Sequence, residues 1–430
     1  MTLRLPAFTA RFVVVALLGL AVAACRERPD EDGAAPYARV VAESIEQIER
    51  GTGLTFKRPP VLEVHSKEQV REFLVRRFDE QSPASEMAAE EQVFKTLGLI
   101  PPDMDYRRFL LDLLNEQIVG YYDPRADKLY VVEGQARDAT NIAIAHELIH
   151  ALQAQYVNLD SIQGVTGDVD RQLAVQSVLE GQATFEQMSA MAGGDISLRI
   201  PGGWDQIRRT IREVQGEMPL FANAPLVIQE SLLFPYLSGA DFVHRFKAQR
   251  GRANPLDDLP VSTEQVLHSR AYFGATRDVP SVITLPAPAI GEKVYENGIG
   301  EFGTRVFVYE HTNDQNTAVQ AAMGWDGDRY VLTRTAAGHS IAWVSVWDSD
   351  LDAAEYASAM AETVMRRYGG LPEAAAGSAA GAVRRASGRG RTVEIRTREA
   401  AGRTLVLYVD VPEGQSTDVI DLAAVKLEAR

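Results

Sequence analysis

The sequence predicts an α+β protein: a mostly helical first domain that contains a β-hairpin, followed by a smaller α+β domain. Apolar residues recur at helical spacing up to Arg250, and strand-like alternation gathers beyond residue 290. A proline-rich stretch over 280–288 separates the two patterns. Because a chain of 430 residues exceeds what one compact core usually holds, we predict domains over 37–285 and 290–430.

The first 36 residues are predicted to lie outside both domains. A positively charged start leads into the apolar run Phe12–Ala23, which is typical of a secretory signal. The run ends at Cys25, in a sequence that resembles a bacterial lipobox, where the cysteine is lipidated after cleavage. We therefore predict a signal peptide over 1–24 and a lipidated Cys25 on a polar tether, which make the protein exported and membrane-anchored. Arg26, where an aspartate would favour inner-membrane retention, weakly favours the outer membrane.

The amino-acid composition limits the classes of partner that the protein could bind. The net charge of −15 argues against nucleic acid, whose phosphates would be repelled, and against a basic membrane-binding face. Cys25 is the chain's single cysteine, so core packing alone must stabilise the folded part. We find no phosphate-binding loop, serine nucleophile elbow or dinucleotide fingerprint. Oligomeric state is left open.

The elements of the first domain follow from periodicity and from turn residues. A strand is expected at 61–64, and a hairpin from 118–122 and 129–132 around a turn at 123–127. A polar loop is expected at 160–170. Helices are predicted at 37–50, 68–78, 87–97, 106–116, 141–156, 171–191 and 233–250.

The second domain alternates strands with one helix, predicted at 351–367. An Ala/Gly/Arg-rich segment over 375–391 is expected to be a flexible loop. Strands are predicted at 304–309, 330–334, 340–347, 392–396 and 404–410.

The strongest chemical signal is an H-E-x-x-H motif, His146 to His150, inside a helical pattern. Residues four apart leave one face of a helix, so both imidazoles point toward one ion, and imidazole suits Zn²⁺. Glu147 lies beside that face, where it can take a proton from an attacking water. The motif predicts a zinc site with His146 and His150 as ligands and Glu147 as general base.

A catalytic zinc site usually has a third protein ligand. We favour Glu180, 30 residues after His150, on a second helix that could pack against the first. Gly181 and Ala183 are small and would let those two helices approach closely. The competing ligands are Glu186, Asp168 and Asp170; the two aspartates are more simply explained as solvated loop residues or a helix N-cap.

His146, His150 and Glu180 together resemble the gluzincin arrangement of peptidase clan MA, in which a glutamate on the following helix completes the zinc site. The wider chain also resembles a group of bacterial exported zinc-metallopeptidase-like lipoproteins. The resemblance implies a zincin-like fold that cleaves a peptide or protein substrate, and does not identify that substrate. The matching pieces are 119–124, 146–153, 179–184, 234–239, 262–268 and 324–330.

Two further roles follow from that resemblance. Zincins bind extended peptide on an edge strand beside the active-site helix, and the strand with Leu129, Tyr130 and Val131 is the candidate. A donor to the developing oxyanion is also expected. Tyr236 is favoured because a turn near Pro235 and Gly239 could present it; Tyr121, Tyr122 and His268 remain alternatives.

Two alternatives to a peptidase stay open. One is a non-peptide zinc hydrolase such as a cell-wall amidase. The other is a catalytically idle peptidase fold retained as a binding or scaffold protein.

Overall fold

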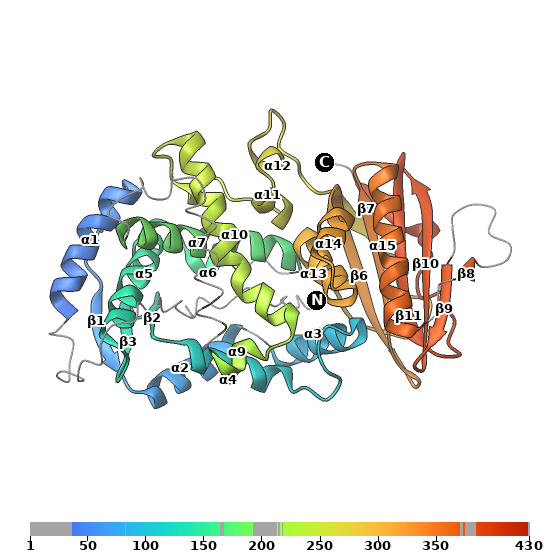
Figure 1. Ribbon diagram of the computed structural model, residues 1–430, viewed down its shortest axis with the longest axis horizontal. Coiled ribbons are helices and arrows are strands. Elements are labelled where there is room, and N and C mark those ends of the chain that lie inside the picture. Colours follow the sequence, from blue (N-terminus) through green and yellow to red (C-terminus); the bar gives the residue numbers. More distant parts are fainter. Residues whose placement is uncertain are drawn as a thin grey trace, which may run out of the picture.

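The computed structural model describes residues 37–81, 83–163, 167–191, 213, 216, 218–369, 373–374 and 384–428. The protein is α+β, with a helical half followed in the chain by a half built on a large β-sheet (Figure 1). The predicted signal peptide, Cys25 and the tether lie outside the described residues. Among the residues described, none of the helices is both long and apolar enough to span a bilayer.

Every helix predicted in the first half is present; α10 begins at Leu226 instead of 233, and the other ends shift by a few residues. Local sequence explains the boundaries: α4 begins where Asp105 accepts a hydrogen bond from the Arg108 backbone N–H at 3.0 Å, and α3 ends at Gly98 in the left-handed conformation. The helices are α1 (Ala38–Thr52), α2 (Lys67–Gln81), α3 (Ala84–Leu97), α4 (Tyr106–Gln117), α5 (Arg137–Tyr156), α6 (Leu159–Gln163), α7 (Val169–Met191), α9 (Pro219–Ala222), α10 (Leu226–Arg250), the 3-10 turn η3 (Pro255–Asp257), α11 (Thr263–Leu267) and α12 (Ser269–Phe273).

The predicted hairpin forms, but its second strand lies at the centre of a three-stranded sheet. β3 (Lys128–Val132) pairs in parallel with β1 (Val61–His65) and antiparallel with β2 (Gly120–Asp123). The expectation that Leu129, Tyr130 and Val131 form a substrate-binding edge is therefore wrong, because both sides of β3 are already paired. Sequence spacing placed the hairpin and a strand at 61–64 correctly, but could not reveal that this strand, β1, pairs with β3, whose paired residues lie 67 positions later.

The side chains of β3 also belong to the interior. Leu129 and Val131 pack with Ile144 and Leu148 of α5, and the ring of Tyr130 stacks on His65. These contacts fix the sheet against the helix that carries both motif histidines, so the strand supports the site instead of presenting substrate to it.

α10 crosses α7 at a backbone-to-backbone contact. A Cβ on Gly181 would lie 2.3 Å from the Gly239 carbonyl oxygen, and a Cβ on Gly239 would lie 2.0 Å from the Ser177 carbonyl oxygen. Gly181 is therefore small because α10 packs against it, and not because α5 does, so that part of the prediction is wrong. Ala183 does pack with the apolar residues of α5, as predicted. No turn presents Tyr236 either, since Pro235 and Gly239 lie inside the 25-residue helix α10.

The second half is built on an antiparallel seven-stranded sheet of order β5-β6-β7-β11-β10-β9-β8. α13, α14 and α15 cover one face (Figure 1), and a two-stranded sheet of β4 and β12 packs on the other. Its elements are β4 (Val282–Thr284), β5 (Glu292–Asn297), α13 (Gly300–Thr312), α14 (Gln315–Ala322), β6 (Trp325–Thr335), β7 (Gly338–Trp347), α15 (Asp350–Tyr368), β8 (Glu373–Ala374), β9 (Arg384–Gly388), β10 (Arg391–Ala400), β11 (Arg403–Pro412), the 3-10 turn η4 (Leu422–Ala424) and β12 (Lys426–Glu428).

Two predictions in this half are wrong. The β-branched and aromatic run 304–309 lies within helix α13, because Phe302, Val306 and Phe307 bury one helical face against the shared core. Of the predicted loop 375–391, residues 384–388 form strand β9, and 375–383 lie outside the described residues. The strands at 330–334, 340–347, 392–396 and 404–410 and the helix at 351–367 are confirmed.

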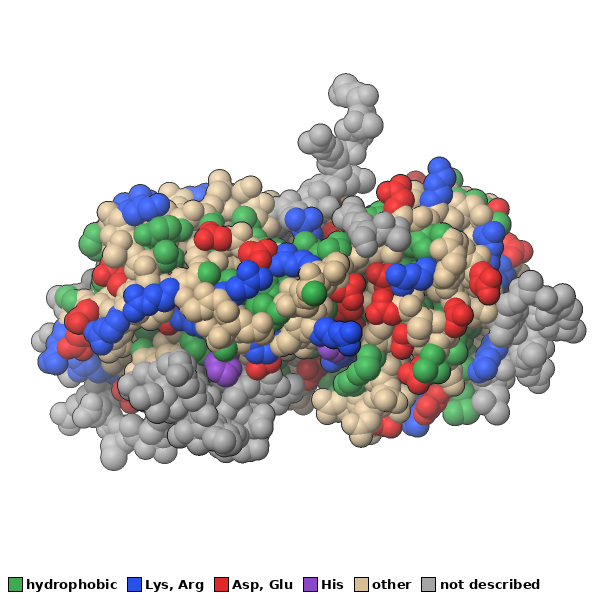
Figure 2. Space-filling view, turned by 90° about the horizontal axis from the view of Figure 1, so that it is seen from above, with side chains coloured by type: hydrophobic (Ala, Val, Ile, Leu, Met, Phe, Trp, Pro, Cys, Tyr) green, Lys and Arg blue, Asp and Glu red, His purple; other side chains and the backbone are tan. Residues whose placement is uncertain are grey.

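One hydrophobic core runs through both halves. It includes Leu97 of α3, Phe242 of α10 and Trp343 of β7, so the predicted division into two domains crosses a shared interior. Trp325, Trp343 and Trp347 are all buried there and form no binding face. On the face shown in Figure 2, acidic and basic side chains are interspersed.

Candidate metal centre

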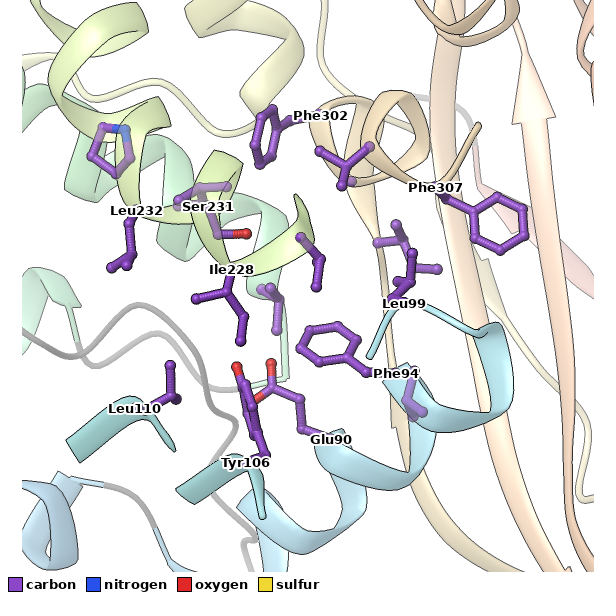
Figure 3. Close-up of a pocket in the computed structure, with 18 of the residues that line it drawn as sticks. Glu90, Phe94, Leu99, Tyr106, Leu110, Ile228, Ser231, Leu232, Phe302 and Phe307 are labelled. Atoms are coloured by element: carbon purple, nitrogen blue, oxygen red, sulfur yellow. The ribbon is translucent and has the colours of Figure 1, made fainter. Parts of the chain in front are cut away.

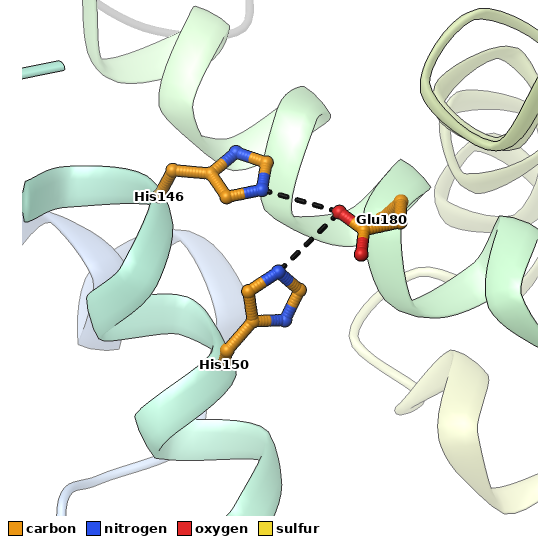
Figure 4. Close-up of side chains that lie close together, drawn as sticks. All are labelled: His146, His150 and Glu180. Carbon is orange, nitrogen blue, oxygen red and sulfur yellow. Dashed lines mark hydrogen bonds and ion pairs between the residues drawn. The ribbon is translucent and has the colours of Figure 1, made fainter. Parts of the chain in front are cut away.

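α5 and α7 bring His146, His150 and Glu180 together in the interior. The Nε2 atoms of the two histidines lie 3.3 Å and 3.4 Å from the same Glu180 oxygen, Oε2 (Figure 4). All three side chains are buried, and each offers a ligand atom within 4.8 Å of the others. The structure thus assembles the three predicted ligands into a group that could hold a metal ion.

Gln153 fixes the tautomer of His150. Its side-chain amide donates to the Leu179 carbonyl and to Gln182 Oε1, both at 3.0 Å, so its own oxygen must face His150 Nδ1 at 2.8 Å. An amide oxygen only accepts, and therefore Nδ1 of His150 carries the proton. Nε2 therefore faces Glu180, where it can offer a lone pair to a metal ion once it gives up its proton.

Gln187 fixes the tautomer of His146 in the same way. Its Oε1 lies 2.9 Å from His146 Nδ1, so that nitrogen donates and Nε2 turns toward Glu180. Gln187 comes from α7, one helix away from the histidine it orients. Both imidazoles therefore have an outer-shell partner of the kind that metal-ligating histidines normally have.

The donor set fits zinc. Tetrahedral zinc with ligands at about 2.0–2.1 Å places neighbouring ligand atoms about 3.3 Å apart, close to the two nitrogen–oxygen distances observed. His150 Nε2 and Glu180 Oε1 are buried with no hydrogen-bond partner among the residues that the structure describes. Buried polar atoms rarely go unsatisfied, so orphaned atoms in a two-nitrogen, one-carboxylate group favour a cation as their missing partner.

The pKa values of the triad also favour a bound cation. Burial raises the pKa of Glu180, but His150 and His146 outweigh it and lower that pKa to about 2. Burial lowers the pKa of His150, whereas Glu180 and then Glu147 oppose burial and bring the pKa to about 9. The carboxylate is thus ionised and holds positive charge beside it, which a divalent cation can replace.

Glu147 lies beside the triad, as predicted for the base. It is fully buried, and within the described residues its carboxylate oxygens have no side-chain hydrogen-bond partner; the Tyr122 backbone N–H lies nearby and lowers its pKa. Burial raises its pKa to about 8, opposed by His150. A glutamate with so raised a pKa is suited to accept and return a proton near neutral pH.

Tyr236 of α10 faces the same centre. Its ring stacks on His146 with centroids 6.1 Å apart, and it is buried. Burial, the nearby Glu180 and Glu147 carboxylates, and a hydrogen bond with Glu180 raise the pKa of Tyr236 well above its usual value. The phenol therefore stays protonated at neutral pH and keeps a proton to donate.

The other candidate donors are engaged elsewhere. Tyr121 Oη lies 2.8 Å from His65 Nδ1, and Tyr122 donates to Asp127 at 2.7 Å. His268 pairs with Glu301 at 2.9 Å. Among these four candidate donors, Tyr236 is the one whose ring contacts a motif histidine.

The competing ligands also lie elsewhere. Asp168 caps α7 by accepting from the Arg171 N–H at 3.0 Å, as anticipated, and Glu186 pairs with Lys247. Asp170 is not a solvated loop residue: it is buried within α7 and accepts from the Thr263 N–H at 3.0 Å.

An apolar cavity of about 170 Å³ borders Tyr236. Figure 3 shows Leu110, Ile228 and Leu232 on its walls, with the carboxyl of Glu90 near the phenol of Tyr106. Burial, followed by Glu86, raises the pKa of Glu90 well above its usual value. On α7, Val169, Leu173 and Gln176 line the cavity at helical spacing; of the residues at the metal centre, the lining includes Tyr236.

Sequence reasoning missed the orienting glutamines. Gln153 lies three residues after His150 and Gln187 seven after Glu180, so helical spacing places each on the face of its neighbouring ligand. Glutamine is common on helix surfaces, and only tertiary packing distinguishes these two.

Comparison with known proteins adds little. Residues 288–418 match a family described as a domain of unknown function (DUF8575). No curated protein matches the chain. A crystal structure from Chloroflexus aurantiacus, described as a candidate hydrolase with a novel fold, is 19% identical; the match covers 57% of this chain and 91% of that one, with a TM-score of 0.35. So low a TM-score establishes no shared fold, and the site has to be judged on its own residues.

Proposed function

We propose that the protein is a zinc-dependent metallopeptidase, with His146, His150 and Glu180 as ligands, and that it is of the gluzincin type. The observation that carries the proposal is the buried triad with the buried carboxylate of Glu147 beside it. A bound zinc ion would act as a Lewis acid at the substrate carbonyl and make water acidic enough to attack near neutral pH.

The protein's own groups would then move the protons. Glu147 accepts the proton of the attacking water and passes it to the leaving amine, and its raised pKa suits both transfers. Tyr236 donates a hydrogen bond to the oxygen that gains charge as the carbonyl is attacked. In the protein without substrate, the same phenol is held toward Glu180.

The free edge beside the site is β2, and we propose that substrate binds there as an added strand. The Val132 N–H donates to the Val119 carbonyl at 2.8 Å, so the alternation of an antiparallel pair turns the backbone groups of Gly120 and Tyr122 away from β3. Tyr122 N–H lies near Glu147. A peptide paired with β2 would therefore pass beside the base.

The cavity next to Tyr236 supports a preference for substrates with a bulky apolar side chain near the scissile bond. A cavity of about 150 Å³ is enough to hold benzene, so this one can take an aromatic or long aliphatic side chain. Its apolar walls would favour that group over a charged one.

We also propose that the enzyme is exported and works at a membrane surface, held by a lipid on Cys25. The support is the sequence pattern alone. Metabolic labelling with a fatty-acid analogue would give a labelled protein that a Cys25→Ala change leaves unlabelled; equal labelling of the two would refute the anchor.

The test of the function is a hydrolysis assay with the zinc-loaded protein on a library of fluorogenic peptides. Glu147→Gln should keep its zinc and lose activity by about 10²–10⁴-fold, because it removes the base and no ligand. Glu43→Gln, an exposed change on α1, is the matched control and should cleave as the wild type does.

The same assay separates the alternatives. Cleavage of peptidoglycan fragments and of no peptide would make the protein a cell-wall amidase. A zinc-loaded protein that cleaves neither, in cells where Glu147→Gln sustains normal function, would make it a binding protein.

A further inference from the structure

A second cluster of metal-ligating side chains lies away from the zinc triad, where the helical half meets the large sheet. Glu264 comes from the first turn of α11, Asp278 from the loop before β4, and Asp348 from the residue after β7. One carboxylate oxygen of each lies within 4.8 Å of the other two. The fold thus brings together three acidic side chains from segments that are separate in the sequence.

Glu264 is the side chain that needs an explanation. It is 5% exposed, and its Oε2 is buried with no hydrogen-bond partner in the described part of the chain. Burial, followed by Asp278 and the other nearby acids, raises the pKa of Glu264 to about 10. A buried, unpaired carboxylate facing two others is costly unless a cation or a proton compensates it.

The neighbouring protein groups do not supply enough positive charge. Arg403 lies 3.6 Å from Asp348, but it also lies 3.2 Å from Asp326 and donates to the Trp347 carbonyl. One guanidinium therefore faces several carboxylates. Burial and the neighbouring acids accordingly raise the pKa of Asp348 to about 6.

Hydrogen bonds hold the three backbone segments in place without consuming the carboxylates. Asp278 N–H donates to the Ala271 carbonyl at 2.9 Å, and its carbonyl accepts from Gln265. Asp348 N–H donates to the Gly324 carbonyl at 2.8 Å. The acids are thus positioned in advance, and the half-exposed Asp348 leaves a path from solvent.

We propose that Glu264, Asp278 and Asp348 bind a calcium ion that ties α11 to the end of β7. The donors are all oxygen, which calcium prefers, whereas the imidazole-rich triad suits zinc. Three carboxylates and solvent water can complete the six to eight ligands of calcium; magnesium usually takes only one or two carboxylates. This site is independent of the zinc chemistry.

The test follows thermal unfolding of the whole purified protein, washed with a calcium-selective chelator, as calcium is added to about 10 mM at constant ionic strength. The wild type should show a saturable rise in Tm of several degrees, larger than with magnesium, because the ion binds the folded state. Calcium bound at saturation, measured by equilibrium dialysis, should approach one ion per chain.

Glu264→Gln and Asp348→Asn should abolish both responses. Both variants are expected to fold, and Glu264→Gln should be about as stable as the wild type without calcium, since a neutral amide replaces a carboxyl that is itself protonated when no cation is bound. Glu355→Gln, an exposed change on α15, should respond as the wild type does. The proposal would be overturned if calcium did not change the Tm of the wild type, or if the Tm of Glu264→Gln rose with calcium as much as that of the wild type.

Discussion

His146 Nε2 lies 3.3 Å from Glu180 Oε2, although 34 residues separate the two along the chain. The distance matches neighbouring ligands of a tetrahedral zinc ion, and packing of α7 against α5 sets it.

Gln153 is predicted to be a positioning residue for His150. Gln153→Leu removes the acceptor that holds the Nδ1 proton, so the imidazole loses its preferred tautomer and zinc should bind about 10–100-fold more weakly. Competition with a chromophoric chelator measures that affinity. Gln47→Leu, an exposed change on α1, is the control and should bind zinc normally. Unchanged affinity in Gln153→Leu would show that the hydrogen bond does not orient the ligand.

Tyr236→Phe is predicted to separate catalysis from metal binding. The ring still stacks on His146, so zinc content should stay at the wild-type level. Loss of the donor should lower kcat by about 10²–10³-fold with little change in KM. Steady-state kinetics on the best peptide measures both constants; a change confined to KM would assign Tyr236 to substrate binding instead.

Leu232→Trp is predicted to fill part of the cavity beside Tyr236. Peptides with an aromatic side chain near the scissile bond should lose about 10-fold or more in kcat/KM, whereas alanine-containing peptides should be cleaved at the wild-type rate. The alanine substrates serve as the internal control. Equal losses on both substrate types would mean that the cavity plays no part in specificity.

His311 gives the protein a pH-dependent stability outside the site. Burial, and then Arg367, lowers the pKa of His311 from 6.5 to about 3 in the folded protein. The unfolded chain therefore binds more protons between these values, and folding free energy is lost as pH falls below 6.5. At pH 5 this loss is about 2 kcal/mol.

Urea unfolding at pH 7 and pH 5 tests that effect. His311→Gln can keep the hydrogen bond to the Leu97 carbonyl but has no group that titrates here. The drop in stability from pH 7 to pH 5 should be smaller in the variant by about 2 kcal/mol. The same drop in both proteins would show that His311 is already solvated in the folded state.

Much of this arrangement could be predicted from the sequence, because it depends on local spacing. Residues four apart place His146 and His150 on one helical face, and the helix of Glu180 was evident from its periodicity. The helix assignments succeeded for the same reason. At 304–309, by contrast, a β-branched run packs as a helix, because burial of Phe302, Val306 and Phe307 outweighs local propensity.

The rest depends on partners distant in the chain. β1 pairs in register with β3, with paired residues 67 positions apart, and makes β3 a central strand, which no pattern within the hairpin reveals. Gly181 meets Gly239 of α10, so its small size had a cause that spacing could not identify. Likewise, Glu264 looks like any first-turn glutamate until folding brings Asp278 and Asp348 beside it.

Zinc content of the purified protein, by mass spectrometry, tests the central claim most directly, alongside His150→Ala, Glu180→Gln and Glu147→Gln. We predict close to one zinc per chain in the wild type and in Glu147→Gln, loss in His150→Ala, and weakened binding in Glu180→Gln. Absence of zinc from the wild type after reconstitution, or full occupancy in His150→Ala, would contradict the assignment of this triad as the metal centre.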